Sequence, residues 1–368
     1  MRLVTSAFVL AMLFAFALGA TNSSRGESRD FRGMLRLRLG DDLVEGKPLA
    51  WSAAEVTLLG RDGRLYEFPP TEAQDFSRLP TPFSSYSASE IRGQLYRELG
   101  NEFEITGTGH YLVAHPRGTG ELWAQRFEDI YRAFVHYFSV RDMHLGTPEF
   151  PLVAIVWPTQ ADFVRYAAKE GTPVTRNILG YYSPTTNRIA VYDIGAGDSD
   201  DAQWAENMAT VVHEATHQAA FNTGVHNRLS VSPLWIVEGL GTMFEAPGIW
   251  DNVRHRGRRD ELNVGRLAEF KQWIANGRPA EGALEPFVGS DELFRSDMTA
   301  AYAQAWALTY FLVSTRPQDY RRYLSKVAAR PDFSDYTAPQ RLADFTAVFG
   351  RDLNMLDVQF VRFVDRLE

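Results

Sequence analysis

The chain of 368 residues contains no cysteine. A disulfide framework, a cysteine nucleophile, an iron–sulfur cluster and a zinc site with cysteine ligands are therefore excluded. At about 150 residues per domain, the length leaves room for about two domains and a sizeable core. With 45% hydrophobic and 23% charged residues, the composition belongs to neither a disordered nor a fibrous protein.

The chain also lacks an excess of positive charge, because 38 lysines and arginines stand against 46 aspartates and glutamates, a net charge of −8. A nucleic-acid-binding protein needs a basic face that displaces counterions from phosphates. Nucleic acid is therefore not expected as a partner. Beyond the first twenty residues no run is apolar enough to cross a membrane, so no span is expected in the mature protein.

The first twenty residues have the features of a secretory signal peptide. MRLVTSAFVLAMLFAFALGA begins with one arginine, continues with an apolar stretch and ends in small residues. Cleavage is expected near Ala20, with Ala17 as a rival site; retention as a membrane anchor is the alternative. The protein is thus predicted to be secreted or periplasmic, outside the cytoplasm, and residues 21–30 are predicted to be a flexible lead-in.

Residues 31–80 are predicted to form a small β module. MLRLRL alternates between apolar and basic residues, AEVTLLG and RLYEFPP follow, and Arg61-Asp62-Gly63-Arg64 has the composition of a hairpin turn. Residues 81–104 are predicted to be a linker and the lead into the main domain, because the stretch from 78 to 89 is rich in proline and serine. The main domain is then expected over residues 105–368.

The main domain has the pattern of an α+β protein. Its expected order is two short strands, a helix, a buried strand, a helix, a hairpin and a long helix, followed by a helical C-terminal half. The long helix is expected to begin at the cap Asp198-Ser199-Asp200-Asp201 and to end near Phe221.

This long helix contains the sequence His213-Glu214-Ala215-Thr216-His217. Residues four apart lie on one face of a helix, so both imidazoles can bind one ion while Glu214 lies beside it. Two neutral histidine nitrogens with an open position are what a catalytic zinc requires. The alternative is a helix with two unrelated histidines.

A third ligand is available from Glu238, in the segment Trp235-Ile236-Val237-Glu238-Gly239. The distance along the chain allows the first helix to end near Gly224, a loop to run through Pro233, and a second helix to return Glu238 to the metal. The predicted metal ligands are therefore His213, His217 and Glu238.

Three segments resemble the peptidase-MA-like family of secreted gluzincins, which are zinc metallopeptidases: HEATHQAAF, PLWIVEGLGTMFE and the YAQAWAL segment that begins at Tyr302. The resemblance extends over roughly residues 105–365 and leaves out the β module. It implies a zincin-like, thermolysin-like fold with a mixed sheet, an active-site helix and a helical C-terminal half. It also implies one zinc ion per chain.

The same resemblance implies a role for individual residues. His213, His217 and Glu238 would bind the metal, Glu214 would be the general base, and Tyr302 would donate a hydrogen bond to the oxyanion. Ordinary packing is the alternative for Tyr302.

Three further features are candidates for supporting roles. Thr242 and Glu245 follow Glu238 by one and two helical turns and could orient a ligand, although ordinary helix positions are the alternative. The segment NRIAVYD (187–193) could be an edge strand that pairs with an extended peptide, or a plain sheet strand.

The predicted function is a secreted zinc peptidase that hydrolyses peptide bonds through a zinc-activated water, with Glu214 as the general base. A non-catalytic extracytoplasmic binding protein on a peptidase scaffold and a zinc hydrolase of non-peptide amides are the alternatives. The sequence lacks the G-x-M-E-N motif of zinc aminopeptidases, which favours an endopeptidase. The substrate and the oligomeric state are left open.

Overall fold

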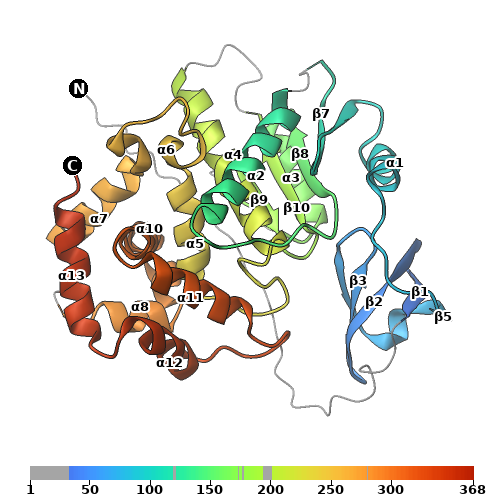
Figure 1. Ribbon diagram of the computed structural model, residues 1–368. Coiled ribbons are helices and arrows are strands. Elements are labelled where there is room, and N and C mark those ends of the chain that lie inside the picture. The colour runs from blue at the N-terminus through green and yellow to red at the C-terminus, as the bar shows by residue number, and fades with distance from the viewer. Residues whose placement is uncertain (1–32, 119–121, 173, 176–177, 194–200, 280) are drawn as a thin grey trace.

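The computed structural model describes residues 33–118, 122–172, 174–175, 178–193, 201–279 and 281–368, and for 201–207 the backbone alone. The predicted signal peptide, the lead-in and the expected helix cap at 198–200 lie outside the described residues. Within these described ranges, no helix is long and apolar enough to span a membrane. Figure 1 shows the N-terminal sheet at one end of the molecule, the helical C-terminal half at the other, and a second sheet between them.

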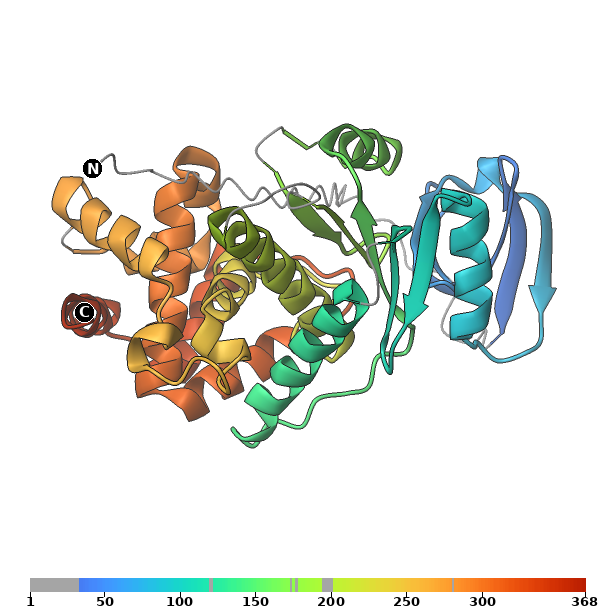
Figure 2. The ribbon, with the colours of Figure 1, turned by 90° about the horizontal axis from the view of Figure 1, so that it is seen from above.

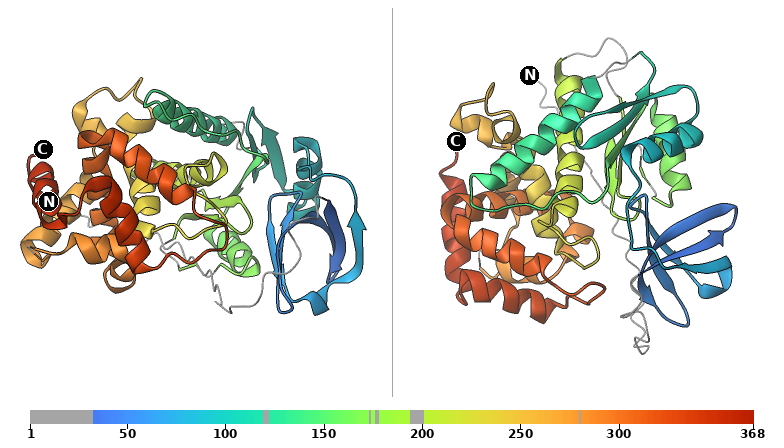
Figure 3. Two further views of the ribbon diagram at one scale, coloured as in Figure 1. Left: turned by 60° about the horizontal axis from the view of Figure 1, so that its bottom comes forward. Right: turned by 45° about the vertical axis from the view of Figure 1, so that its right-hand side comes forward.

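The first sheet is antiparallel and has the strand order β4-β3-β2-β1-β5. Alternation in MLRLRL buries Leu35 and Leu37 in a small core of their own. Register shifts in the pairing of β1 with β5 and of β2 with β3 accompany the curvature visible in Figure 3. The elements are β1 Met34–Leu39, β2 Asp42–Trp51, β3 Val56–Gly60, β4 Leu65–Phe68, the 3-10 helix η2 Pro70–Glu72 and β5 Gln74–Leu79.

A helix, α1 (Ala88–Leu99), occupies much of the stretch expected to be a linker. Ser87 and Glu90 form a reciprocal capping box at its N-terminus, which is the S-x-x-E signature that the proline- and serine-rich composition obscured. Ile91 and Leu95 are buried against the second sheet. The predicted domain boundaries themselves stay predictions.

The second sheet is mixed, with the strand order β6-β7-β8-β10-β9. Strands β7, β8 and β10 are parallel, whereas β6 and β9 run antiparallel to their neighbours at the two edges. The strands are β6 Phe103–Gly107, β7 Tyr111–Pro116, β8 Leu152–Trp157, β9 Gly180–Ser183 and β10 Arg188–Tyr192.

Helices cover both faces of this sheet (Figure 2), which explains why its central strands are continuous apolar runs. Helices α1 and α3 (Gln160–Lys169) pack on one face. Helices α2 (Leu122–Ser139) and α4 (Asp201–Asn222) pack on the other face, within the main core of the protein.

Of the two alternatives for 187–193, the structure shows the ordinary sheet strand and not the edge strand. This segment forms β10, which pairs with β8 on one side and β9 on the other. Its near-complete burial suits an inner position. The edge strand beside α4 is β9, the first arm of the predicted hairpin.

The C-terminal half is helical from α5 onward, and α5 and α10 pack closely at its centre. A side chain at Gly239 of α5 would clash with the hydroxyl of Thr309 and the backbone of Ala305, so glycine is needed for this approach. The chain thus has the predicted α+β class: an N-terminal antiparallel β module, a mixed second sheet and a helical C-terminal half. The helices are α5 Leu234–Phe244, α6 Pro247–Trp250, the 3-10 helix η3 Arg258–Glu261, α7 Val264–Asn276, α8 Leu284–Gly289, α9 Glu292–Ser296, α10 Met298–Thr315, α11 Pro317–Ala328, α12 Ala338–Phe349 and α13 Leu353–Asp365.

Candidate active site

Helices α4 and α5 bring together the three predicted ligands. Helix α4 ends two residues before Gly224, whose positive φ of 85° turns the chain away, and Pro233 precedes the first residue of α5. The intervening loop lets α5 return alongside α4. His213, His217 and Glu238 are each about 1% exposed.

The ligand atoms of this triad converge on one point. The Nε2 atoms of His213 and His217 are 2.8 Å apart, and Glu238 Oε2 lies 3.2 Å and 3.5 Å from them, respectively. All the offered atoms fall within 4.8 Å of one another. Two imidazoles and one carboxylate form the three-residue donor set that is typical of a catalytic zinc ion.

A buried unpartnered oxygen at the same place supports the fit to a metal-dependent site. Glu214 is fully buried, and its Oε1 has no hydrogen-bond partner among the described residues. Leaving a carboxylate oxygen buried and unpaired is costly, and such atoms mark sites where a further group binds. The other oxygen, Oε2, accepts a 2.6 Å hydrogen bond from the backbone N–H of Tyr182 in edge strand β9.

Burial and neighbouring charges shift the pKa values of the two buried carboxyl groups in this cluster. Burial raises the pKa of Glu214 to about 7, and the carboxylate of Glu238 acts in the same direction. For Glu238, burial is outweighed by the charge of His217 and by hydrogen bonds from both histidines, which lower the pKa to about 2. Glu214 therefore titrates near neutrality, whereas Glu238 is fully ionised. This difference is expected where one carboxyl group transfers protons and the other binds a metal ion.

The pKa values of the two histidines are also shifted in opposite directions. Burial lowers the pKa of His217. Burial acts likewise on His213, but hydrogen bonds to Glu238 and Glu245 outweigh it and raise the pKa of His213 to about 10. Without an ion, a proton on His213 therefore compensates the surrounding carboxylates.

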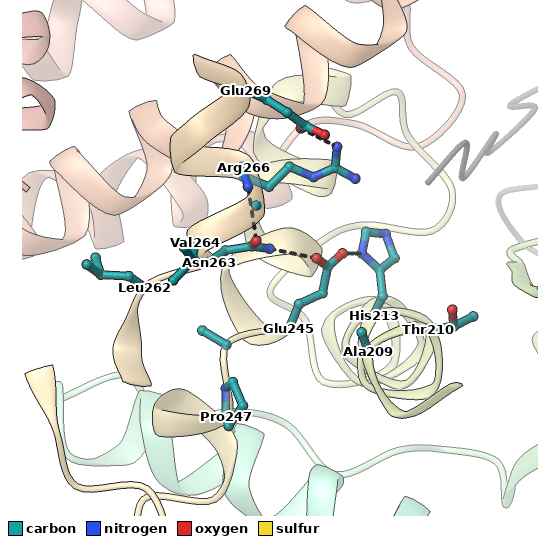
Figure 4. A pocket seen from close by; sticks show the side chains of 12 residues that line it. Ala209, Thr210, His213, Glu245, Pro247, Leu262, Asn263, Val264, Arg266 and Glu269 are labelled. Carbon is teal, nitrogen blue, oxygen red and sulfur yellow. Dashed lines mark hydrogen bonds and ion pairs between the residues drawn. The ribbon is translucent and has the colours of Figure 1, made fainter. Parts of the chain in front are cut away.

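Glu245 orients His213, as Figure 4 shows. Its Oε1 accepts a 2.8 Å hydrogen bond from His213 Nδ1, which leaves Nε2 directed at the converging ligands. Its Oε2 accepts a 2.6 Å bond from the amide of Asn263. Asn263 also caps α7 by accepting from the backbone N–H of Arg266. The sequence interpretation missed Asn263, although an asparagine just before an amphipathic helix indicates a cap.

Thr242 makes no contact of this kind. Its hydroxyl donates a 2.6 Å hydrogen bond to the main-chain oxygen of Glu238, within its own helix. It therefore stabilises the α5 backbone and does not orient a ligand side chain.

Tyr302, on α10, does lie at the site. Its ring centroid is 6.5 Å from that of His213 and 5.6 Å from that of Phe294. Burial raises the pKa of the phenol well above its usual value, and the charge of Glu238 and a hydrogen bond to it act in the same direction. The hydroxyl is therefore protonated at neutral pH and able to donate.

Gly241, which the sequence interpretation also missed, lies directly against the imidazoles. A methyl group there would come within 2.8 Å of His213 and 3.0 Å of His217. Glycine in a helix interior costs about 1 kcal/mol relative to alanine, so the two glycines of EGLG were a signal of close contact.

A pocket of about 360 Å³ opens beside His213 (Figure 4). Its apolar part comes from residues such as Leu262 and Val264, while Arg266 and Glu269 form an ion pair of 2.8 Å at one side. The pocket extends from the N-terminal half of α4 to the first turns of α7.

Comparison with known proteins gives a limited result. The model of a family described as "Protein of unknown function (DUF1570)" matches residues 207–334, about a third of the chain. A search of curated proteins finds no match.

Among solved structures, the M1 zinc metallopeptidase from Deinococcus radiodurans is similar with 15% identity and a TM-score of 0.36, over 71% of this chain and 50% of that one. A variant of that enzyme has 14% identity and a TM-score of 0.37 over the same shares, and a two-domain variant bound to L-arginine has 14% and 0.38, over 72% and 51%. The chain thus spans about half the length of these enzymes. The likeness is weak, and neither the fold nor the function is inferred from it.

Proposed function

We propose that this protein is a zinc-dependent peptidase in which His213, His217 and Glu238 bind one zinc ion. The observation that supports this most directly is the convergence of the three ligand atoms next to Glu214, a buried carboxyl with one unpartnered oxygen. A structural metal site needs no such group beside it. A zinc ion at this position supplies Lewis acidity, polarising the substrate carbonyl and acidifying a water molecule.

The remaining steps belong to side chains of this chain. Glu214, with a pKa raised to about 7 by burial, accepts the proton of the attacking water on its free Oε1 and then delivers it to the leaving amine. The Tyr182 amide holds the other oxygen in place throughout. The neutral phenol of Tyr302 donates to the oxyanion that develops on the substrate.

Strand β9 is the element that binds the substrate backbone in this proposal. It pairs with β10 on one side, and no other described strand pairs with its free edge. An extended peptide can add to such an edge through main-chain hydrogen bonds. The pocket beside His213 then receives a side chain of that peptide. The protein would act outside the cytoplasm, as proposed from the N-terminal sequence, and we favour an endopeptidase.

The first test combines metal content with a conservative variant. Elemental mass spectrometry of purified wild type should give about one zinc per chain, lost in His217→Ala. Glu214→Gln keeps the size of the side chain and the acceptor for Tyr182, so it should retain zinc while kcat on internally quenched, end-blocked peptides falls about 10²- to 10⁴-fold. Glu292→Gln, an exposed substitution, is the matched control.

Each alternative has its own outcome in this test. Folded wild type without zinc after reconstitution would refute the metal site. A Glu214→Gln protein with unchanged behaviour would favour the binding-protein alternative. Cleavage of simple amides but of no peptide would favour the hydrolase of non-peptide amides.

A further inference from the structure

The turn between β3 and β4 in the first sheet contacts the part of the protein that contains the candidate active site. The carbonyl oxygen of Gly63 accepts a 2.6 Å hydrogen bond from Arg228, which lies on the loop between α4 and α5 and is buried. The N–H of Leu65 donates a 2.8 Å bond to the carbonyl of Thr185, in the turn between β9 and β10. One turn of the module thus contacts both the hairpin that ends in the edge strand and the loop that joins the two metal-binding helices.

The packing at this turn leaves little space for a side chain. Gly63 has a φ of 87°, and a Cβ atom there would lie 3.0 Å from the ring of Phe150 and 3.3 Å from the amide of Asn187. The backbone conformation therefore favours glycine, and a side chain at this position would also force Phe150 and Asn187 to shift.

Asn187 extends this contact to the active-site helix. It is buried, and its own φ is 57°. Its Oδ1 accepts hydrogen bonds from the Tyr182 hydroxyl, 2.8 Å, and from the Asn222 amide, 2.7 Å. Its main-chain oxygen accepts a 2.9 Å bond from Gln218, the residue after His217.

Ion pairs also connect the β3–β4 turn with the second sheet and its helices. Arg64 lies 3.0 Å from Glu170, at the end of α3, and 3.8 Å from Glu98 of α1. Glu98 in turn pairs with Arg188 of β10 at 2.8 Å. These side chains are at most 22% exposed, so the loss of one partner would leave the other charge poorly solvated.

We propose that the N-terminal β module positions edge strand β9. The β3–β4 turn of the module makes the contact that keeps β9 in place, and Gly63 and Arg228 are the positioning residues. The inference rests on the proposed function. Strand β9 has four residues and a hydrogen-bonded strand on one side, so few bonds of its own sheet hold it. Its Tyr182 amide must nevertheless stay in contact with Glu214, and a misplacement of about 1 Å at a catalytic group can cost about 10²-fold in rate.

The test compares two glycines of the same sheet that both have positive φ. Gly63→Ala pushes the turn away from Phe150 and Asn187, whereas Gly40→Ala imposes similar backbone strain where no atom of the described residues lies within 4 Å. Hydrogen–deuterium exchange of the full zinc-loaded chain is measured over residues 178–192. We expect exchange there to quicken at least about fivefold in Gly63→Ala and to stay unchanged in Gly40→Ala, with α10 unaffected in both.

A second pair of variants reports the consequence for catalysis. Arg228→Met should lower kcat on blocked peptides about tenfold with zinc content intact, and Arg228→Lys should restore part of it. A loss confined to melting temperature would indicate a purely structural joint and overturn the proposal. Equal exchange over 178–192 in the two glycine variants would overturn it as well. If the wild type cleaves no peptide, the proposed function fails, while the exchange comparison still decides whether the module holds β9.

Discussion

At the scale of single residues, the four groups of the candidate site have divided roles because their surroundings differ. Glu238 is ionised by its two histidine partners, whereas Glu214 has a backbone N–H and, among the described residues, no cationic side chain in hydrogen-bond contact. His213 is held by a carboxylate on each ring nitrogen. The environment thus separates the proposed ligand Glu238 from the proposed base Glu214, although both are glutamates.

The raised pKa of Glu214 predicts how activity depends on pH. A general base must be ionised, so kcat/KM should fall as pH decreases through the pKa of Glu214. That pKa is about 7 without an ion and becomes lower when a divalent cation is nearby, so the acid limb should lie at or below about pH 7. The profile of kcat/KM for a blocked peptide between pH 4.5 and 9 measures it. An acid limb that persists in the residual activity of Glu214→Gln would contradict the assignment.

The contact of Glu245 with His213 predicts an effect on metal affinity. Glu245→Gln removes the carboxylate that orients the imidazole, so zinc should bind about 10- to 100-fold more weakly while the fold is kept. Competition with a fluorescent chelator gives the dissociation constant. Thr242→Val is the comparison, because Thr242 bonds its own helix, and it should leave zinc affinity within about twofold.

At the scale of elements, the site depends on how closely α4, α5 and α10 approach one another. Gly239 lets the backbone of α10 approach α5 closely, and Gly241 does the same for the imidazoles of α4. Helix α5 thus has a glycine facing each of its two neighbours. Both glycines weaken α5 as an isolated helix, and the tertiary contacts compensate.

This arrangement makes Gly241→Ala a sharp test. Alanine favours a helix, yet its methyl group would lie 2.8 Å from the imidazole of His213, so zinc affinity should fall at least tenfold. The matched control is Gly93→Ala in α1, where the nearest atom is the far end of Arg97, at 3.6 Å. That control should be neutral or stabilise the protein by about 0.5–1 kcal/mol in denaturant unfolding. Undiminished zinc affinity in Gly241→Ala would mean that the imidazoles do not lie against this helix.

At the scale of the whole molecule, long-range polar contacts join segments that are distant in sequence. The first sheet contacts the loop between α4 and α5 through Arg228, and the end of α3 through Arg64. In the helical half, Arg278 pairs with Asp357 of α13 and donates a 2.9 Å hydrogen bond to Gln304 of α10. These groups are buried, so each depends on its partner.

The buried pair predicts a large effect on stability without an effect on the site. Asp357→Asn leaves the charge of Arg278 buried without a carboxylate, and the free energy of unfolding should fall by about 3–5 kcal/mol. Urea unfolding followed by circular dichroism measures this, and zinc stoichiometry at low temperature should stay unchanged. The exposed pair of Arg295 with Glu292 is the control, and Glu292→Gln should cost less than about 1 kcal/mol. Similar losses in both variants would mean that the buried pair is not needed for the docking of α13.

Much of this protein could be predicted from local patterns. The turn at 61–64, the strands of the second sheet and the spacing of His213, His217 and Glu238 depend on periodicities of two and 3.6 residues, which neighbours in the chain determine. Helix α1 was not predicted, although Ser87 and Glu90 have the spacing of a capping box, because a proline- and serine-rich composition is also typical of linkers.

The remaining features were decided by tertiary structure. Which strand lies at the sheet edge depends on the pairing order, and pairing between distant segments leaves no local trace, so the sequence left open whether 187–193 is an edge strand or an inner one. The contacts of Asn263 with Glu245 and of Gly63 with Arg228 join residues from separate elements. The sequence by itself determined which residues can bind a metal and on which helices, because that chemistry is local. Only the folded chain decided which groups orient them and which strand faces them, because those contacts arise when the elements pack.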